Sequence, residues 1–236
     1  CPHSVIRAKF YPAAALVDAP ASFKSAPISA RGFPETRYTL QIYSEDCTGC
    51  ALCTEVCPAL SPREQGVKAI NMQPKPADLD ADRASLGFFE QLPVNNRSRV
   101  DFSSVRGTQF LEPLFEFSGA CAGCGETPYV RLLSQLFGDR LLVANATGCS
   151  SIYGGNLPTT PWARNGEGKG PAWSNSLFED NAEFGFGFRL TADQHRGQAV
   201  AALEAMKGEL GAELVETLIS APQRLESEIR AQRNRV

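Results

Sequence analysis

The residues best suited to chemistry are four closely spaced cysteines, Cys47, Cys50, Cys53 and Cys57, followed by Pro58. This C-x2-C-x2-C-x3-C-P spacing is typical of a loop that holds a [4Fe–4S] cluster, because three thiolates on one tight turn reach three irons of one cubane. Free thiols in a protein core are rarely so dense, and the spacing is poor for a zinc site. The run therefore predicts an iron–sulfur site.

The chain opens on Cys1-Pro2, the same pair with which such a run ends. In proteins with two such clusters, the cysteine before the proline ligates the other cluster. We therefore expect Cys1 to end a preceding run and to complete a shell of four thiolates. The residues of that shell are Cys1, Cys47, Cys50 and Cys53. Cys57 is then expected to bind a second cluster, whose other ligands precede Cys1. The alternative is that Cys1 stands at this position by accident.

A second cysteine group lies in the other half of the chain. Cys121 and Cys124 form a C-x-x-C pair among small residues, and Cys149 follows the mostly apolar segment 140–146. That segment is typical of a buried strand in a parallel sheet, and α/β folds place ligands where such a strand enters a small-residue loop, here 147–151. The three cysteines are candidate ligands of a metal site. On spacing alone, a redox pair with a core cysteine and a zinc site remain alternatives.

Composition narrows the class of protein. The 236 residues carry a net charge of −3, which gives no electrostatic argument for a nucleic-acid partner. No apolar run approaches the roughly 18 residues of a membrane span, and no secretory signal is visible. Eight cysteines clustered at metal-ligand spacing, without a secretory context, indicate reduced thiols and a cytoplasmic protein.

The first part of the chain is expected to form a small module around its clusters. Apolar and alternating patterns predict strands over 4–11, 38–43 and 67–72, and a loop rich in Ala, Pro and Ser over 12–36. This module, residues 1–73, has too little core to fold without its metal, so we expect cluster binding and folding to be coupled. The residues that share one face of the second strand are Tyr38, Leu40 and Ile42.

The remainder is expected to contain a linker and a second domain. Residues 74–112 carry several prolines and mixed charges, which indicates a linker or an excursion across a neighbouring domain. Residues 113–236 are interpreted as the second domain, with amphipathic helices over about 181–206 and 212–230. The two histidines of the chain, one with no identifiable partner and one expected on a helix surface, are His3 and His195.

A further helix is predicted directly after the C-x-x-C pair. Thr127 suits the N-cap and Pro128 the first helical position, and Gly138 is expected to end the helix. The residues of its expected apolar face are Leu132, Leu133, Leu136 and Phe137.

Five segments span most of the chain: CPHSVIRAKF, EDCTGCALCTEVCPA, FSGACAGCGETPY, NATGCSS and GKGPAWSNSLFEDNAEFGFG. In this order they closely resemble pyruvate:ferredoxin (flavodoxin) oxidoreductases. The resemblance implies a large multidomain homodimer of anaerobic metabolism that uses thiamine diphosphate, Mg²⁺ and three [4Fe–4S] clusters. It implies conversion of pyruvate and coenzyme A to acetyl-CoA and CO₂, with electrons passed one at a time to ferredoxin or flavodoxin.

The resemblance also accounts for all eight cysteines. It implies that one cluster is held by Cys1, Cys47, Cys50 and Cys53. It implies that Cys57 is a ligand of the companion cluster. The three residues matching ligands of the cluster nearest the thiamine are Cys121, Cys124 and Cys149. Glu126 and Cys149 also match positions beside the thiamine diphosphate. The implied fold mixes α/β and α+β, with a ferredoxin-like [4Fe–4S] module followed by a partial α/β thiamine-diphosphate-binding domain.

Several parts of the family pattern are missing from the chain. It lacks the downstream G-D-G…N type motif for diphosphate and Mg²⁺, the fourth ligand of the thiamine-proximal cluster, and the domains that bind pyruvate and coenzyme A. We therefore expect an internal fragment that has no oxidoreductase activity when isolated. The alternatives are an oxidoreductase for another 2-oxoacid or indolepyruvate, a pyruvate:NADP⁺ oxidoreductase, a stand-alone iron–sulfur electron-transfer protein and a structural zinc protein.

Overall fold

The computed structural model describes residues 1–28, 32–101, 103–155 and 159–236. The chain divides into two compact units. Unit 1 comprises residues 1–143 and 147–174, and unit 2 comprises residues 144–146 and 175–236. These divisions do not coincide with the expected domain boundaries at residues 73 and 112, because both cysteine groups fall within unit 1.

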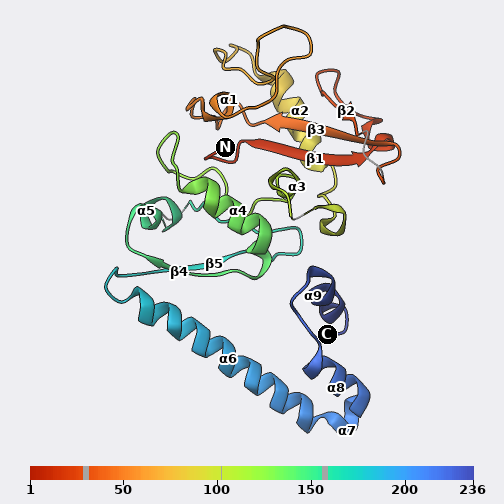
Figure 1. Ribbon diagram of the computed structural model, residues 1–236, viewed down its shortest axis with the longest axis vertical. Helices are drawn as coiled ribbons and strands as arrows, with labels where there is room; N and C mark the ends of the chain where they lie inside the picture. The colour runs from red at the N-terminus through yellow and green to blue at the C-terminus, as the bar shows by residue number, and fades with distance from the viewer. Residues whose placement is uncertain (29–31, 102, 156–158) are drawn as a thin grey trace. The chain divides into compact units, whose positions relative to one another are not determined.

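Unit 1 contains a three-stranded antiparallel sheet (Figure 1). Its order is β1 (Ile6–Pro12), β3 (Thr36–Ile42) and β2 (Ala26–Pro27), and the short 3-10 helix η1 (Ala13–Leu16) follows β1. The strands predicted over 4–11 and 38–43 are therefore confirmed. Within β3, Thr39 is buried.

The strand predicted over 67–72 is wrong. Of this segment, only Lys68 forms a β-bridge, to Leu60. The Lys68 ammonium group instead donates hydrogen bonds to the carbonyl oxygens of Thr54 and Glu55, the latter at 2.8 Å. Those carbonyls end the single-turn helix α1 (Leu52–Glu55) and have no partner within it. The segment thus follows the cysteine loop as irregular chain.

The interval expected as a linker or an excursion across a neighbouring domain, residues 74–112, lies within unit 1. It contains α2 (Asp80–Gln91), the 3-10 helix η2 (Arg97–Arg99) and α3 (Val105–Thr108). From β1, Lys9 Nζ donates to the carbonyl oxygen of Phe89 at 2.9 Å, at the end of α2. The buried apolar residues of unit 1 are Val5, Phe10, Tyr11, Phe89, Leu92, Leu111, Leu114, Phe115 and Tyr153.

Helix α4 (Thr127–Phe137) forms where predicted, with Glu126 rather than Thr127 as its N-cap, and the 3-10 helix η3 (Gly138–Arg140) follows it. Its predicted apolar face is wrong: Leu133 and Phe137 are 40% and 45% exposed. The residues of α4 that are buried are Thr127, Arg131, Ser134 and Gln135.

The buried face of α4 is polar because of the backbone against which it packs. It lies against the irregular backbone around Leu111 and Leu114. Ser134 Oγ accepts a hydrogen bond from the backbone N–H of Leu114 at 3.1 Å, and Gln135 Nε2 donates to the carbonyl oxygen of Leu111 at 2.8 Å. Buried backbone groups must be paired, and here polar side chains do so.

After η3 come β4 (Leu142–Ala146), α5 (Cys149–Gly155) and β5 (Ala172–Ser176). Strands β4 and β5 form a two-stranded sheet, and no residue of β4 is buried. The prediction that this strand is buried is therefore wrong. A Cβ atom at Gly155 would lie 2.8 Å from the Trp173 ring, so α5 can approach this ring only with glycine there.

Unit 2 is mostly helical. It contains α6 (Asn181–Ala205), α7 (Lys207–Leu210), α8 (Ala212–Ser220) and α9 (Glu226–Arg233). The helix predicted over 181–206 is confirmed, whereas the one predicted over 212–230 is broken around Pro222, because proline cannot continue a helix. His195 is exposed on α6, as expected. No helix among the described residues is long and apolar enough to cross a membrane.

Candidate iron–sulfur site

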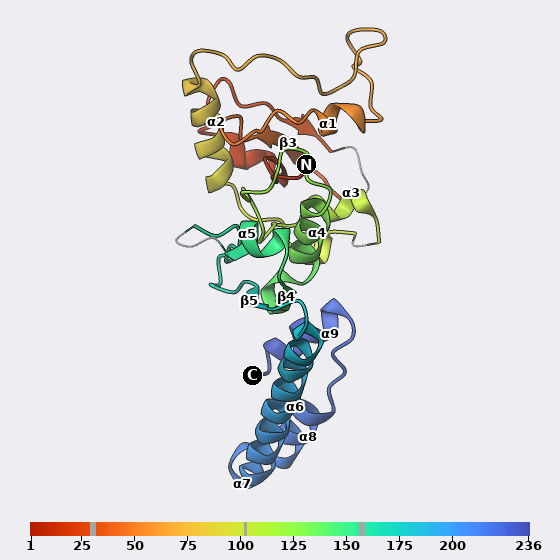
Figure 2. The same ribbon diagram turned by 90° about the vertical axis from the view of Figure 1, so that its left-hand side faces the viewer.

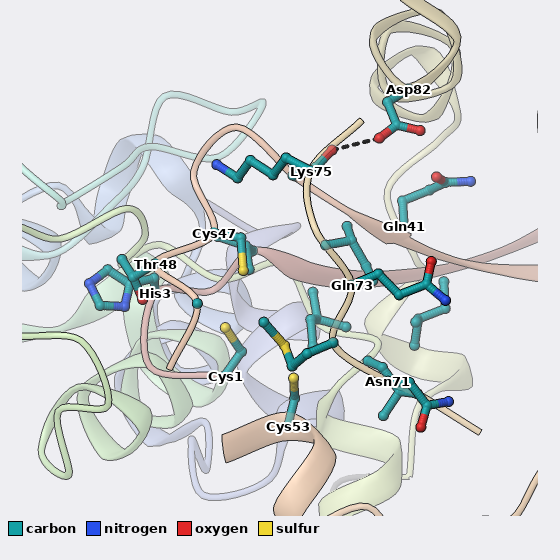
Figure 3. Close-up of a pocket in the computed structure, with 18 of the residues that line it drawn as sticks. Cys1, His3, Gln41, Cys47, Thr48, Cys53, Asn71, Gln73, Lys75 and Asp82 are labelled. Carbon is teal, nitrogen blue, oxygen red and sulfur yellow. Dashed lines mark hydrogen bonds between the residues drawn. The ribbon is translucent and has the colours of Figure 1, made fainter. Parts of the chain in front are cut away.

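Four cysteines of unit 1 line one cavity of about 640 Å³: Cys1, Cys47, Cys50 and Cys53. Figure 3 shows the sulfur atoms of three of them, Cys1, Cys47 and Cys53, pointing into the same space. In both Figure 1 and Figure 2 the N-terminus, and with it Cys1, lies between α1 and α4. The chain thus brings its first residue beside a loop that is distant in sequence.

The backbone of the cysteine loop turns sharply at two points. Gly49 has φ +71° and Ala51, the residue before α1, has φ +61°. Left-handed backbone of this kind lets the chain reverse within one or two residues, and it is costly for alanine. The two turns bring Cys47 and Cys50 round to the cavity, and Cys53 is carried by the first turn of α1.

The other walls of the cavity mix apolar and polar side chains. Leu40 and Ile42 of β3 and Met72 of a later segment line it beside polar residues such as Gln41 and Asn71. Leu40 is 52% exposed and faces the cavity rather than the core. Four thiols that line one cavity fit a [4Fe–4S] cluster, because such a cluster takes one thiolate at each iron.

The geometry does not resemble the site of a single metal ion. Among the described residues, no three His, Cys, Asp or Glu side chains stand close enough together to hold one ion. A zinc ion draws four ligands to about 2.3 Å, whereas each thiolate of a cubane binds a different iron, so its sulfurs stand further apart.

Cys57 stands apart from this group. It is absent from the residues that line the cavity, and its Sγ lies 3.7 Å from the carbonyl oxygen of Ala59. This is the arrangement that the predicted crossover requires, in which the cysteine before the proline serves another cluster.

The second cysteine group surrounds the start of α4. The backbone N–H of Cys124 donates to the carbonyl oxygen of Cys121 at 3.0 Å, which closes a tight turn with φ +76° at Gly123. Burial raises the pKa of the Cys124 thiol, but hydrogen bonds from the backbone N–H groups of Thr127 and Glu126 outweigh it, and the pKa lies below its ordinary value. Cys149 begins α5, so the predicted loop 147–151 is partly helical.

Tyr153 is a site residue that the sequence interpretation missed. It lies one helical turn after Cys149 on α5, it is 6% exposed, and its hydroxyl has no hydrogen-bond partner among the described residues. Its pKa is raised, first by burial, then by the Glu126 carboxylate and by thiolate charge on Cys124 and Cys149. These three residues therefore gather around one phenol, and only the i, i+4 spacing from Cys149 could have indicated it.

His3, for which no partner was predicted, has one. Its Nε2 lies 3.0 Å from the carbonyl oxygen of Ala120, next to Cys121. The two cysteine groups are therefore linked through a side chain that also lines the cavity.

Comparison with known proteins agrees with this geometry. A family model described as "4Fe-4S binding domain" matches residues 40–60, which include the whole cysteine run. The chain is 54% identical over 236 residues to a pyruvate-flavodoxin oxidoreductase of Nostoc sp., covering all of this chain and 20% of the relative.

Two further relatives give the same result. Identity is 53% over 220 residues to a probable pyruvate-flavodoxin oxidoreductase of Escherichia coli, covering 93% of the chain and 19% of the relative. It is 46% over 205 residues to a pyruvate:ferredoxin oxidoreductase of Moorella thermoacetica, covering 86% and 17%. The chain spans about a fifth of the length of the curated relatives it matches. Along its whole length, the chain matches one part of the pyruvate-flavodoxin and pyruvate:ferredoxin oxidoreductases.

Proposed function

We propose that this chain is the electron-relay part of a pyruvate:ferredoxin or pyruvate:flavodoxin oxidoreductase, which converts pyruvate and coenzyme A to acetyl-CoA and CO₂. The observation that carries this proposal is the cavity shared by Cys1, Cys47, Cys50 and Cys53, with Cys57 outside it. The names of the relatives, and the length of this chain over which they are similar to it, support the choice of pyruvate as substrate and of ferredoxin or flavodoxin as acceptor.

Each cysteine has a role in this proposal. The residues that hold the first cluster are Cys1, Cys47, Cys50 and Cys53. Cys57 contributes to a companion cluster. The residues that supply three ligands of a further cluster, near thiamine diphosphate, are Cys121, Cys124 and Cys149. Glu126 and Cys149 lie beside the thiamine. When bound, thiamine diphosphate with Mg²⁺ supplies the electron sink for decarboxylation, and the clusters supply one-electron storage.

The protein groups prepare these sites. The backbone N–H groups of Glu126 and Thr127 stabilise the thiolate of Cys124, the form that binds iron. Leu40, Ile42 and their neighbours limit water around the first cluster. Low access of water and hydrogen bonds to sulfur are the means by which a protein sets cluster potentials.

The remaining expectations belong to the whole protein. We place it in the cytoplasm under anaerobic conditions, as a homodimer, with the isolated chain inactive towards pyruvate. The cysteines of the described chain are all free thiols, which supports a reducing compartment. One observation favours a second acceptor: the chain is 42% identical over 222 residues to a mitochondrial pyruvate dehydrogenase [NADP(+)] of Euglena gracilis.

The test is whether Cys1 and Cys50 serve one cluster while Cys57 serves another. The full-length protein is purified anaerobically, reduced with dithionite and examined by EPR. Cys1→Ala and Cys50→Ala are expected to remove the same reduced-cluster signal, and Cys57→Ala a different one. If Cys57→Ala and Cys50→Ala removed the same signal, the proposed ligand set would be wrong.

A further inference from the structure

The two cysteine loops of unit 1 touch each other. A Cβ atom at Gly123, between Cys121 and Cys124, would lie 3.6 Å from Cys50 Cβ and 3.6 Å from Leu52 Cδ1. These are ordinary van der Waals distances. No side chain therefore separates the loop of the second cysteine group from the loop that lines the cavity.

A set of hydrogen bonds holds the chain start against the segment that leads into Cys121. The backbone N–H of Phe117 donates to the carbonyl oxygen of His3 at 3.1 Å. Ser4 Oγ donates to the carbonyl oxygen of Phe115 at 3.1 Å. His3 Nε2 lies 3.0 Å from the carbonyl oxygen of Ala120. Since a carbonyl oxygen only accepts, Nε2 must carry the hydrogen.

His3 is the side chain nearest to both cysteine groups in this set. It lines the cavity two residues after Cys1, and its acceptor Ala120 directly precedes Cys121. It is 5% exposed, and Nδ1 has no hydrogen-bond partner among the described residues. Its one side-chain bond is thus made to the backbone of the other cysteine loop.

Other contacts keep the segment in place without His3. Arg7 pairs with Glu116, and its guanidinium lies 5.5 Å and 5.3 Å from the ring centres of Tyr43 and Phe117. These contacts and the backbone bond of Phe117 do not involve the imidazole. Loss of the imidazole is therefore expected to loosen the last residues before Cys121 and to leave the fold intact.

We propose that His3 is a positioning residue, whose Nε2–H bond to the Ala120 carbonyl fixes the spacing between the group held at Cys1, Cys47, Cys50 and Cys53 and the group held at Cys121, Cys124 and Cys149. The inference rests on the proposed function, because both groups are clusters of that relay. With both clusters bound, an electron passing between them would cross this contact, so that the group held at Cys121 would be oxidised and the group held at Cys1 reduced, with no bond made or broken. Electron transfer slows steeply with distance, so a small shift of the loop slows it.

The experiment compares four substitutions in the anaerobically purified full-length protein. His3→Gln keeps an N–H near the position of Nε2. His3→Phe and His3→Asn remove it, the latter without adding bulk. His195→Phe changes the exposed histidine of α6 and is the matched control. Each protein is assayed for iron and sulfide, for the EPR splitting between the two reduced clusters, and for hydrogen–deuterium exchange of residues 119–124.

All variants are expected to retain full iron and sulfide. In His3→Phe and His3→Asn the splitting weakens and exchange in residues 119–124 rises about fivefold, the equivalent of one neutral hydrogen bond of about 1 kcal/mol. His3→Gln and His195→Phe behave as the unchanged protein. Unchanged splitting and exchange in His3→Asn, with full clusters, would overturn the role of His3 and leave the proposed function standing. If the protein without any substitution held no iron after reconstitution, the proposed function itself would be overturned.

Discussion

Gly123 and Cys50 bring two cysteine loops into contact, since a Cβ atom on the glycine would lie 3.6 Å from the Cβ of the cysteine. The loops belong to segments that the sequence assigns to different domains. Both loops lie in one compact unit. Their contact places the two proposed clusters next to each other.

Substitution at Gly123 is expected to act through both backbone and space. Gly123 and Gly168 share a φ of +76°, but a Cβ at Gly168 has nothing within 4 Å. Alanine at either position is expected to cost about 1–2 kcal/mol of unfolding free energy, from left-handed backbone alone. Gly123→Val is expected to cost more than Gly168→Val, because its branches meet Cys50 and Leu52. Denaturant unfolding under anaerobic conditions measures the difference, and equal costs for the two valine variants would argue against a tight contact.

Tyr153 is expected to influence the group held at Cys124 and Cys149. The Glu126 carboxylate and the Cys124 and Cys149 thiols act on its buried hydroxyl, and a bound cluster would offer that hydroxyl a sulfur acceptor. A hydrogen bond to that sulfur stabilises the reduced cluster, so Tyr153→Phe is expected to lower its reduction potential. Potentiometric EPR measures the shift, and Tyr129→Phe, at a 75% exposed position of α4, is the control. An unchanged potential in Tyr153→Phe would exclude the bond.

Glu112 is expected to make stability depend on pH. Burial raises the pKa of this carboxyl, Lys9 lowers it, and the balance is upward. A raised pKa means that the folded state binds the proton more tightly than the unfolded state, so this stabilising contribution is present at low pH and lost as pH rises through the folded pKa. Glu112→Gln should therefore gain stability relative to the unchanged protein as the pH rises above the ordinary pKa of a glutamate carboxyl.

The control for this prediction is Glu64→Gln, at an exposed position. Urea unfolding at several pH values gives the stability difference between each variant and the unchanged protein. A difference for Glu112→Gln that is independent of pH would show that the carboxyl titrates alike in both states.

Sequence patterns correctly predicted the parts of the structure that depend on residues close together in the chain. The cysteine spacing predicted the loop around Cys47, Cys50 and Cys53, and alternation predicted β1 and β3. Two of the three residues predicted to share a face of β3, Leu40 and Ile42, line the cavity rather than the core.

Interactions between distant segments account for what was missed. The buried face of α4 is polar because Ser134 and Gln135 pair with irregular backbone around Leu111 and Leu114, and no helical periodicity shows this. The residues around Lys68 favoured a strand, but the Lys68 ammonium group instead donates a hydrogen bond to a carbonyl oxygen at the end of α1. His3 and Tyr153 acquire their surroundings only when the chain start and α5 meet the loop around Cys121.

The metal content of the chain after anaerobic reconstitution decides whether the cysteine cavity holds an iron–sulfur cluster. Iron, acid-labile sulfide and zinc are measured per chain, with EPR after dithionite reduction. The account predicts about four irons and four sulfides at the Cys1, Cys47, Cys50 and Cys53 site. They are lost in Cys50→Ala and kept in Cys57→Ala. One zinc per chain, with no signal from a reduced cluster, would contradict it.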